Sequence, residues 1–319
     1  MKALIRVAGL TLIIASSTMA FQLPTLEETH SAIGSTDGLP TALQRALKPD
    51  QDFEPIPIPH SGDWLAEHHE RGQAFSEYMR LRANRPDNSR NIIYLQPLGK
   101  FKKDYSPPLE LLREYAVAYF MMDVKIFPVQ RISAISLTNR VNPYTQNRQI
   151  LTADILQLLK ETLPENAFCV LAVTMEDLYP DPRWNFVFGQ ASLQDRVGVF
   201  SFARYDPAFY GESRGHLYQK LLLQRSAKVL VHETAHMFSL AHCIYFKCVM
   251  NGSNHLQESD SRPLSLCPVC LHKLQHSIGF DVSARYRHLI QFYRKIGFTR
   301  EADWVSRRLK KIEGSNRAQ

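Results

Sequence analysis

Two histidines and a glutamate lie within the run His232-Glu233-Thr234-Ala235-His236. In a helix, side chains four residues apart share one face, so both imidazoles could reach one metal ion at the Zn–N distance of about 2.0–2.1 Å. Glu233 would then stand beside the open position of the metal, where it could take a proton from water and pass it to a leaving amine. The run therefore predicts a hydrolytic zinc site of the H-E-x-x-H type, although so short a pattern also occurs by chance.

A third histidine, His242, follows His236 by six residues. This is the spacing of the pattern H-E-x-x-H-x-x-G-x-x-H, in which the third histidine completes the zinc site. The glycine of that pattern is Ser239 here, and a serine that leaves the helix as sharply as glycine costs about 1 kcal/mol more. Met250 lies eight residues beyond His242, where a methionine turn would place its thioether beneath the metal. Ordinary core packing is the alternative for Met250.

Four cysteines follow as two close pairs, Cys243 with Cys248 and Cys267 with Cys270. The spacings C-x4-C and C-x2-C, separated by a longer gap, fit a structural zinc site whose four thiolates leave no open position. Two disulfides and a C-x2-C redox pair are the alternatives, but Cys267 does not open a helix directly after a strand as a redox motif would. Cys169 lies in an apolar run and is expected to be a packed thiol.

The hydrophobic pattern predicts the elements that position these residues. Short apolar runs predict strands over Asn91–Leu98, Val124–Pro128, Phe168–Met175, Trp184–Gly189 and Val197–Arg204. Helical spacing predicts helices over Thr41–Leu47, Trp64–Leu81, Pro108–Met122, Thr152–Leu163 and Leu217–Ala241. This order predicts a mixed α/β (α+β) fold in which helices pack on a sheet, and the last helix carries the two histidines.

The chain has 319 residues, of which 45% are hydrophobic, 10% aromatic and 22% charged. This composition excludes fibrous, collagenous and wholly disordered proteins. Beyond residue 20 no apolar run approaches the roughly 20 residues of a membrane span, so no stable span is expected. We expect a proline-rich extension over 21–90, a catalytic domain over 91–282 and a basic helical tail over 283–319.

Both ends of the chain carry further signals. Residues 1–20 combine Lys2 and Arg6, a short apolar run and small residues, as in a signal peptide. If this segment is cleaved the protein is secreted or periplasmic, and otherwise it is intracellular. Residues 283–319 hold ten Lys and Arg against three acids, which suits a solvated helical face or a patch for an acidic partner. No nucleic-acid motif accompanies this charge, so no nucleic-acid partner is expected, and the oligomeric state is not predicted.

The histidine and cysteine region as a whole resembles the archaemetzincin family, and in particular its type-2 branch. The runs that carry the resemblance are HETAHMFSLAHCIYFKCVM and NGSNHLQESDSRPLSLCPVCLHKL. The similarity continues upstream through AFCVLAVTMEDLYP, WNFVFGQASL and VGVFSFARYDPAFY. The resemblance implies a zincin-like metzincin fold: a twisted mixed sheet with an antiparallel edge strand, a long active-site helix and a C-terminal subdomain clamped by the four cysteines.

The resemblance also assigns roles. It implies two zinc ions per chain, one catalytic and one structural, with Glu233 as the general base and Met250 as the methionine-turn residue. The implied ligands are His232, His236 and His242 for the catalytic zinc and Cys243, Cys248, Cys267 and Cys270 for the structural zinc. We therefore expect a zinc metallopeptidase that acts on peptides or proteins, with aminopeptidase-like or other short-peptide hydrolase activity.

By analogy with other zincins, Trp184–Gly189 would be an edge strand along which an extended peptide pairs. A hydrogen-bond donor for the transition state is also needed, and His255, Tyr205 and Tyr210 are candidates. The alternative function is a catalytically impaired, zinc-stabilised binding protein whose metal site is distorted by Ser239.

Overall fold

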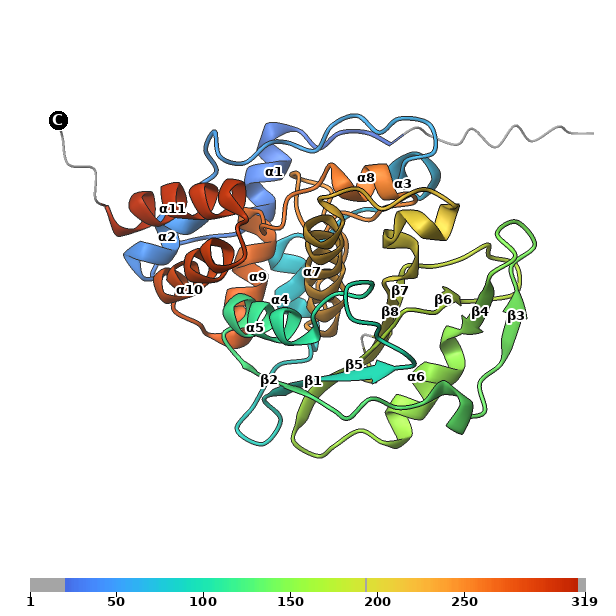
Figure 1. Cartoon of the computed structure of the whole chain (residues 1–319). Coiled ribbons are helices and arrows are strands. Elements are labelled where there is room, and N and C mark those ends of the chain that lie inside the picture. The colour runs from blue at the N-terminus through green and yellow to red at the C-terminus, as the bar shows by residue number, and fades with distance from the viewer. Residues whose placement is uncertain (1–20, 193, 315–319) are drawn as a thin grey trace, which may run out of the picture.

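Five of the strands form one sheet in the order β2-β1-β5-β8-β7 (Figure 1). A computed structural model describes residues 21–314 except residue 193, so the predicted signal peptide lies outside the described residues. The first four strands in this order run parallel to one another, and the edge strand β7 pairs antiparallel with β8. The mixed α/β architecture with an antiparallel edge strand is confirmed. The strands are β1 (Ile92–Leu98), β2 (Asp123–Ile126), β5 (Ala167–Thr174), β7 (Gly189–Ser192) and β8 (Val197–Ser201).

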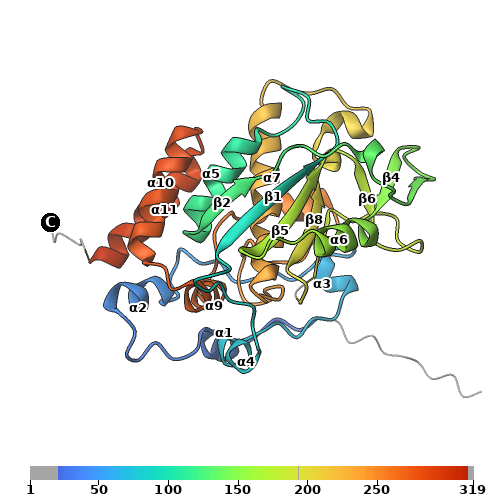
Figure 2. The same ribbon diagram turned by 90° about the horizontal axis from the view of Figure 1, so that it is seen from below.

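Side chains that alternate along the central strands give the sheet two apolar faces. In β1, Ile93 and Leu95 contribute to one buried cluster, whereas Ile92 and Tyr94 contribute to the other. Figure 2 shows α6 and α7 on opposite faces of the sheet. The covering helices are α5 (Leu109–Phe120) and α7 (Tyr218–Met237) on one face and α6 (Thr152–Glu161) on the other.

Three short strands form a second sheet in the order β3-β4-β6. The sequence pattern predicted none of them, because each has only three or four residues. They are β3 (Asn139–Val141), β4 (Arg148–Leu151) and β6 (Asp177–Tyr179). Short 3-10 helices connect elements at η1 (Ile132–Ala134), η2 (Ala203–Tyr205) and η3 (Pro207–Tyr210).

The proline-rich segment before β1 folds into four short helices that pack on the C-terminal half of the chain (Figure 1). The helix expected over Thr41–Leu47 is confirmed. The single helix expected over Trp64–Leu81 is wrong. Gly72 adopts a φ of +70°, and a side chain there would collide with Ile244, so the chain leaves the helical conformation between two shorter helices. The four are α1 (Leu26–Ile33), α2 (Thr41–Leu47), α3 (Trp64–Glu67) and α4 (Phe75–Arg80).

The C-terminal residues form a helical hairpin in which most of the described basic side chains are exposed, as a solvated face requires, whereas Arg285 and Arg308 are buried. Arg308 is fully buried and pairs with Asp50 at 2.8 Å, and the buried Arg285 donates to the carbonyl of Tyr119 at 2.6 Å. The basic charge is therefore partly neutralised by the N-terminal segment, while the domain boundaries remain predictions. The helices are α8 (Leu256–Asp260), α9 (Pro268–Ile278), α10 (Val282–Lys295) and α11 (Thr299–Glu313). None of the described helices is long and apolar enough to cross a membrane.

Candidate active site and metal centres

The helix α7 ends in a turn that directs the chain back toward its own last residues. The N–H groups of Ser239 and Leu240 both donate to carbonyls of the last helical turn, which is the Schellman arrangement. Ser239 takes the left-handed position with a φ of +64°, where glycine would be less strained. Its Oγ accepts a hydrogen bond from the Asn84 N–H at 3.2 Å, which offsets part of that strain. Despite Ser239, the reversal brings His242 beside the two helical histidines.

The three predicted histidine ligands lie together, with one ring nitrogen of each within 4.8 Å of the others. Nδ1 of His232 lies 2.8 Å from the Val249 carbonyl oxygen, and Nδ1 of His236 lies 2.6 Å from that of Leu240. A carbonyl only accepts, so both Nδ1 atoms carry the proton and both Nε2 lone pairs are free. The two Nε2 atoms are 3.1 Å apart, close to the roughly 3.3 Å expected for two nitrogens on one tetrahedral zinc. The donor set therefore fits a zinc ion.

Both helical histidines are neutral near pH 7. Burial, reinforced by the neighbouring imidazoles, lowers the pKa of His232 below its usual range and that of His236 to about 3. Only the neutral imidazole can bind a metal through its nitrogen lone pair. The site is therefore in the protonation state that metal binding requires.

The third histidine has a carboxylate partner from the N-terminal segment. Nδ1 of His242 donates to Oε1 of Glu70 at 2.7 Å, and the His242 ring lies nearly perpendicular to the Trp64 indole, with centroids 5.2 Å apart. Burial alone would raise the pKa of Glu70, but the hydrogen bond from His242, the charge of that imidazole and smaller effects of Trp64 and His236 together hold the pKa below its usual value. Glu70 therefore accepts as a carboxylate and leaves Nε2 of His242 free to bind metal.

We expect Glu70→Ala to weaken zinc binding by about 10- to 100-fold, because His242 loses the group that fixes its orientation. Glu70→Gln keeps a neutral acceptor and should fall between Ala and wild type. Competition with a chromogenic chelator measures the affinity, and Glu212→Ala, at an exposed glutamate, is the control. Wild-type zinc affinity in both Glu70 variants would remove this role from Glu70.

Further hydrogen bonds join the N-terminal segment to the residues between α7 and His242. The Gln73 side chain donates to the Ser239 carbonyl at 3.1 Å and accepts from the Ala241 N–H at 3.2 Å. The Tyr78 hydroxyl donates to the Phe238 carbonyl at 2.9 Å. These bonds satisfy backbone groups just beyond α7, where a helix end leaves carbonyls without intrahelical partners. Residues 54–84, which we call the strap, therefore run alongside the segment that carries the histidines.

Glu233 lies against the backbone of β7. A Cβ atom on Gly189 would fall 2.8 Å from Cδ and Oε1 of Glu233 and 2.9 Å from Cβ of Phe200, so only glycine fits there. Burial raises the pKa of Glu233 to about 8. A cation held by the adjacent histidines would lower that pKa by favouring the carboxylate. Glu233 is thus buried close to the histidines and to the edge strand.

A cavity of about 490 Å³ opens over the histidines and Glu233. Its walls come from α7, from the chain that leads into β7 and from the loop after Met250. Among the described residues of 21–90, only Trp64 lines it, so the strap forms part of one wall and does not fill the cavity.

The edge strand was predicted too early in the chain. Pairing with β8 begins at Gly189, and Trp184 to Phe188 form an irregular run that lines the cavity. Within that run, Val187 makes one isolated bridge to Leu178. The predicted segment therefore lies at the site, but the ladder that could receive a peptide is β7.

The three candidates for a transition-state donor are separated by the structure. Tyr205 lines the cavity, and burial raises the pKa of its hydroxyl above its usual value, so the phenol stays protonated. His255 instead accepts from the Glu258 N–H and lies 3.0 Å from Asp63, outside the cavity lining. Tyr210 is exposed and also lies outside the lining. Tyr205 is the candidate that remains.

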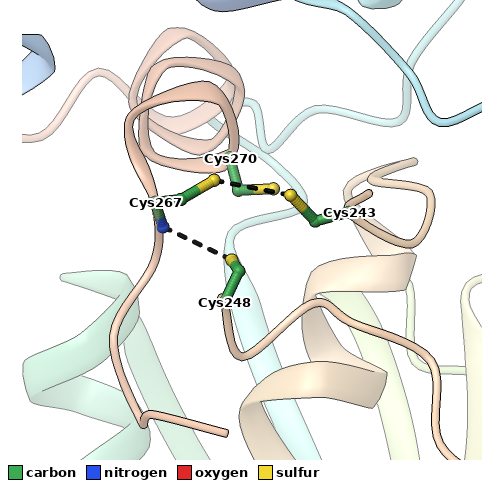
Figure 3. A group of neighbouring side chains, drawn as sticks. All are labelled: Cys243, Cys248, Cys267 and Cys270. Atoms are coloured by element: carbon green, nitrogen blue, oxygen red, sulfur yellow. Dashed lines mark hydrogen bonds between the residues drawn. The ribbon is translucent and has the colours of Figure 1, made fainter. Parts of the chain in front are cut away.

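The four paired cysteines converge on one point, as Figure 3 shows. Their sulfurs lie within 4.8 Å of one another, and those of Cys243 and Cys267 are 3.6 Å apart. A disulfide needs about 2.05 Å, whereas two sulfurs on one tetrahedral zinc lie about 3.8 Å apart. All five cysteines are buried free thiols, which contradicts the two-disulfide alternative. The donor set fits a closed zinc site.

The remaining cysteine and methionine predictions have mixed outcomes. Cys267 caps α9, but no strand precedes it directly, so the redox motif lacks its usual context. Cys169 is a fully buried thiol of β5, and burial raises its pKa, which agrees with a packed and unreactive residue. Met250 is fully buried, and its carbonyl accepts from the Cys243 N–H at 2.8 Å. Its role as the methionine-turn residue remains a prediction.

Comparison with known proteins assigns the family. A family model described as Peptidase family M54 matches residues 127–276. Archaemetzincin-2 of Homo sapiens is 40% identical over 281 residues, which cover 78% of this chain and 77% of that protein. This chain belongs to the archaemetzincin family.

Other archaemetzincins give weaker matches. Archaemetzincin-1 of Mus musculus is 33% identical over 276 residues, which cover 77% of this chain and 55% of that protein. The solved archaemetzincin structure from Methanopyrus kandleri is 29% identical, with a TM-score of 0.46 over 60% of this chain and 97% of that chain. The family resemblance seen in the sequence is confirmed, and the chain is a zinc metallopeptidase.

Four residues of this archaemetzincin site were missed by sequence reasoning. Lys228 precedes His232 by four residues, so the helical face that placed the histidines could have found it. No local pattern marks Glu70, Trp64 or Gly189, because each acts through a contact with a distant part of the chain.

Proposed function

We propose that His232, His236 and His242 hold the catalytic zinc through Nε2, and that Glu233 is the general base for peptide-bond hydrolysis. The observation that carries the proposal is the set of bonds at the three Nδ1 atoms, which leaves all three Nε2 atoms free on one side. A zinc ion bound there supplies Lewis-acid activation of water and of the scissile carbonyl.

The residues around the histidines have complementary tasks. Glu233 takes the proton from the attacking water and gives it to the leaving amine. Tyr205, which stays protonated and lines the same cavity, donates a hydrogen bond to the oxygen on which negative charge develops. The free edge of β7 pairs with an extended peptide and aligns the scissile bond over the histidines.

We further propose that Cys243, Cys248, Cys267 and Cys270 hold a second zinc with a structural role. The four thiols join the loop after His242 to the start of α9. A closed tetrahedral site leaves no position for substrate, so its contribution is to stability.

The alternative of an impaired binding protein rests on Ser239. The bond from Asn84 supports the strained serine, and His242 still joins the other histidines. The geometry therefore favours the hydrolase.

Anomalous diffraction at the zinc edge, combined with digestion of a defined peptide mixture, tests this proposal. We expect one anomalous peak among the histidines, one among the cysteines, and cleavage that a chelator abolishes and added zinc restores. If N-acetylated peptides were cleaved as fast as peptides with a free α-amino group, aminopeptidase activity would be excluded. Absence of a peak at the histidines in zinc-soaked crystals would overturn the assignment.

A further inference from the structure

Lys228 is a buried cation on the wall of the same cavity. It lies on α7 one turn before His232, and residues four apart share a helix face. Its side chain lines the cavity together with His232 and Glu233, yet only 6% of the residue is exposed.

Among the described residues, no carboxylate lies within ion-pair distance of Lys228. Its ammonium donates to the Ser259 carbonyl at 2.6 Å, which fills one of three donor positions. Neighbouring cations are paired, since Arg262 meets Glu258 and Arg225 meets Asp260, both at 2.6 Å. A buried charge normally has a partner, because its desolvation is otherwise uncompensated.

Burial acts on this ammonium in the expected direction and lowers the pKa of Lys228 to about 8. An anion brought against the ammonium would reverse that effect and restore the charged form. Apart from the zinc proposed at the histidines, the other cation of the cavity lining is Arg262, which is already engaged with Glu258 and with the Asn251 carbonyl. Glu233 is the only carboxylate among the described lining residues, and the charges of Asp260 and Glu301 act on Lys228 only from beyond ion-pair distance.

We propose that Lys228 determines specificity by receiving a substrate carboxylate, from an acidic side chain or from the C-terminus of a short peptide. The inference rests on the proposed function for the location of the scissile bond. Four residues of helix separate the Cα atoms of Lys228 and His232 by about 6 Å along the axis. An extended peptide spans roughly that distance in two residues. A carboxylate received by Lys228 is therefore expected within a few residues of the scissile bond, and a peptide library determines which position carries it.

A fixed-position peptide library tests the proposal on the zinc-loaded full chain. Each position next to the cleavage site is set to Glu, Gln or Lys, and each peptide is made as the C-terminal acid and as the amide. We expect kcat/KM to favour Glu over Gln, or acid over amide, by roughly 10- to 100-fold, the range of a charge-assisted hydrogen bond. Preference for Glu identifies a side-chain carboxylate, and preference for the acid identifies the C-terminus.

Variants separate recognition from stability. Lys228→Met keeps the length of the side chain and should bring the ratio of kcat/KM for the preferred carboxylate peptide over its neutral analogue close to one. Lys228→Arg should retain most of this preference. Loss of the Ser259 bond in Lys228→Met could lower Tm, but a purely structural role would leave the ratio unchanged. A ratio near one in wild type, or the wild-type ratio in Lys228→Met, would overturn the inference.

A binding measurement distinguishes failure of this inference from failure of the proposed function. Trp64 and Trp184 line the cavity, so tryptophan fluorescence reports on ligands there. Acetyl-glutamate N-methylamide should bind wild type at least about 10-fold more tightly than the glutamine analogue does, and Lys228→Met should remove the difference. If no library peptide is cleaved, the proposed function fails. The difference in affinity between the glutamate and glutamine ligands then decides the role of Lys228 by itself.

Discussion

Glu233→Gln should reduce kcat by about 10²- to 10⁴-fold while zinc content and fold are retained. Glutamine has nearly the same size as glutamate, so the contact with Gly189 persists, but the amide cannot take a proton from water. The rate is measured on the best peptide from the library, and bound zinc is measured by atomic absorption on the same samples.

The matched control for this variant is Glu165→Gln, which makes the same chemical change at an exposed site. It should retain wild-type kcat. If Glu233→Gln kept activity within a factor of three of the control, Glu233 would not be the general base, even if both zinc ions were present.

Cys267→Ser should lower the zinc content from about two ions per chain to about one and destabilise the fold. A structural zinc contributes directly to folding free energy, so loss of a ligand should cost several kcal/mol and lower Tm on the order of 10 °C. Metal analysis after dialysis and thermal unfolding followed by circular dichroism give the two values.

Cys169→Ser is the control because it also puts a hydroxyl in place of a buried thiol. It should lower Tm through the buried polar group but keep both zinc ions. An unchanged zinc content in Cys267→Ser, or equal loss of zinc in the two variants, would contradict the four-cysteine site.

The sequence predicted those parts of the site that lie close together along the chain. The histidines of α7 follow from helical spacing, and the cysteine pairs follow from their own spacing. The break at Gly72 was visible as a glycine within the predicted helix, and its positive φ confirms that signal. The shift of the edge strand to Gly189 was not visible, because the apolar residues before it resemble a strand but line the cavity.

Long-range contacts were beyond the sequence pattern. Glu70 and His242 are separated by 172 residues, and no local periodicity relates them. The burial of Arg308 against Asp50 is equally remote, since composition alone places an arginine on the surface. The position of Lys228 on the helix face of the histidines could be predicted from spacing, but the absence of a carboxylate partner among the described residues depends on which acids the tertiary fold brings near.

The contact between Glu70 and His242 has a consequence for biosynthesis. The ribosome makes the strap early, whereas the histidines emerge only in the last third of translation. A nascent chain therefore cannot orient its third imidazole until both portions have left the exit tunnel and met. Closing so long a loop is slow compared with local helix formation, so hydrolytic competence should arise at the end of folding.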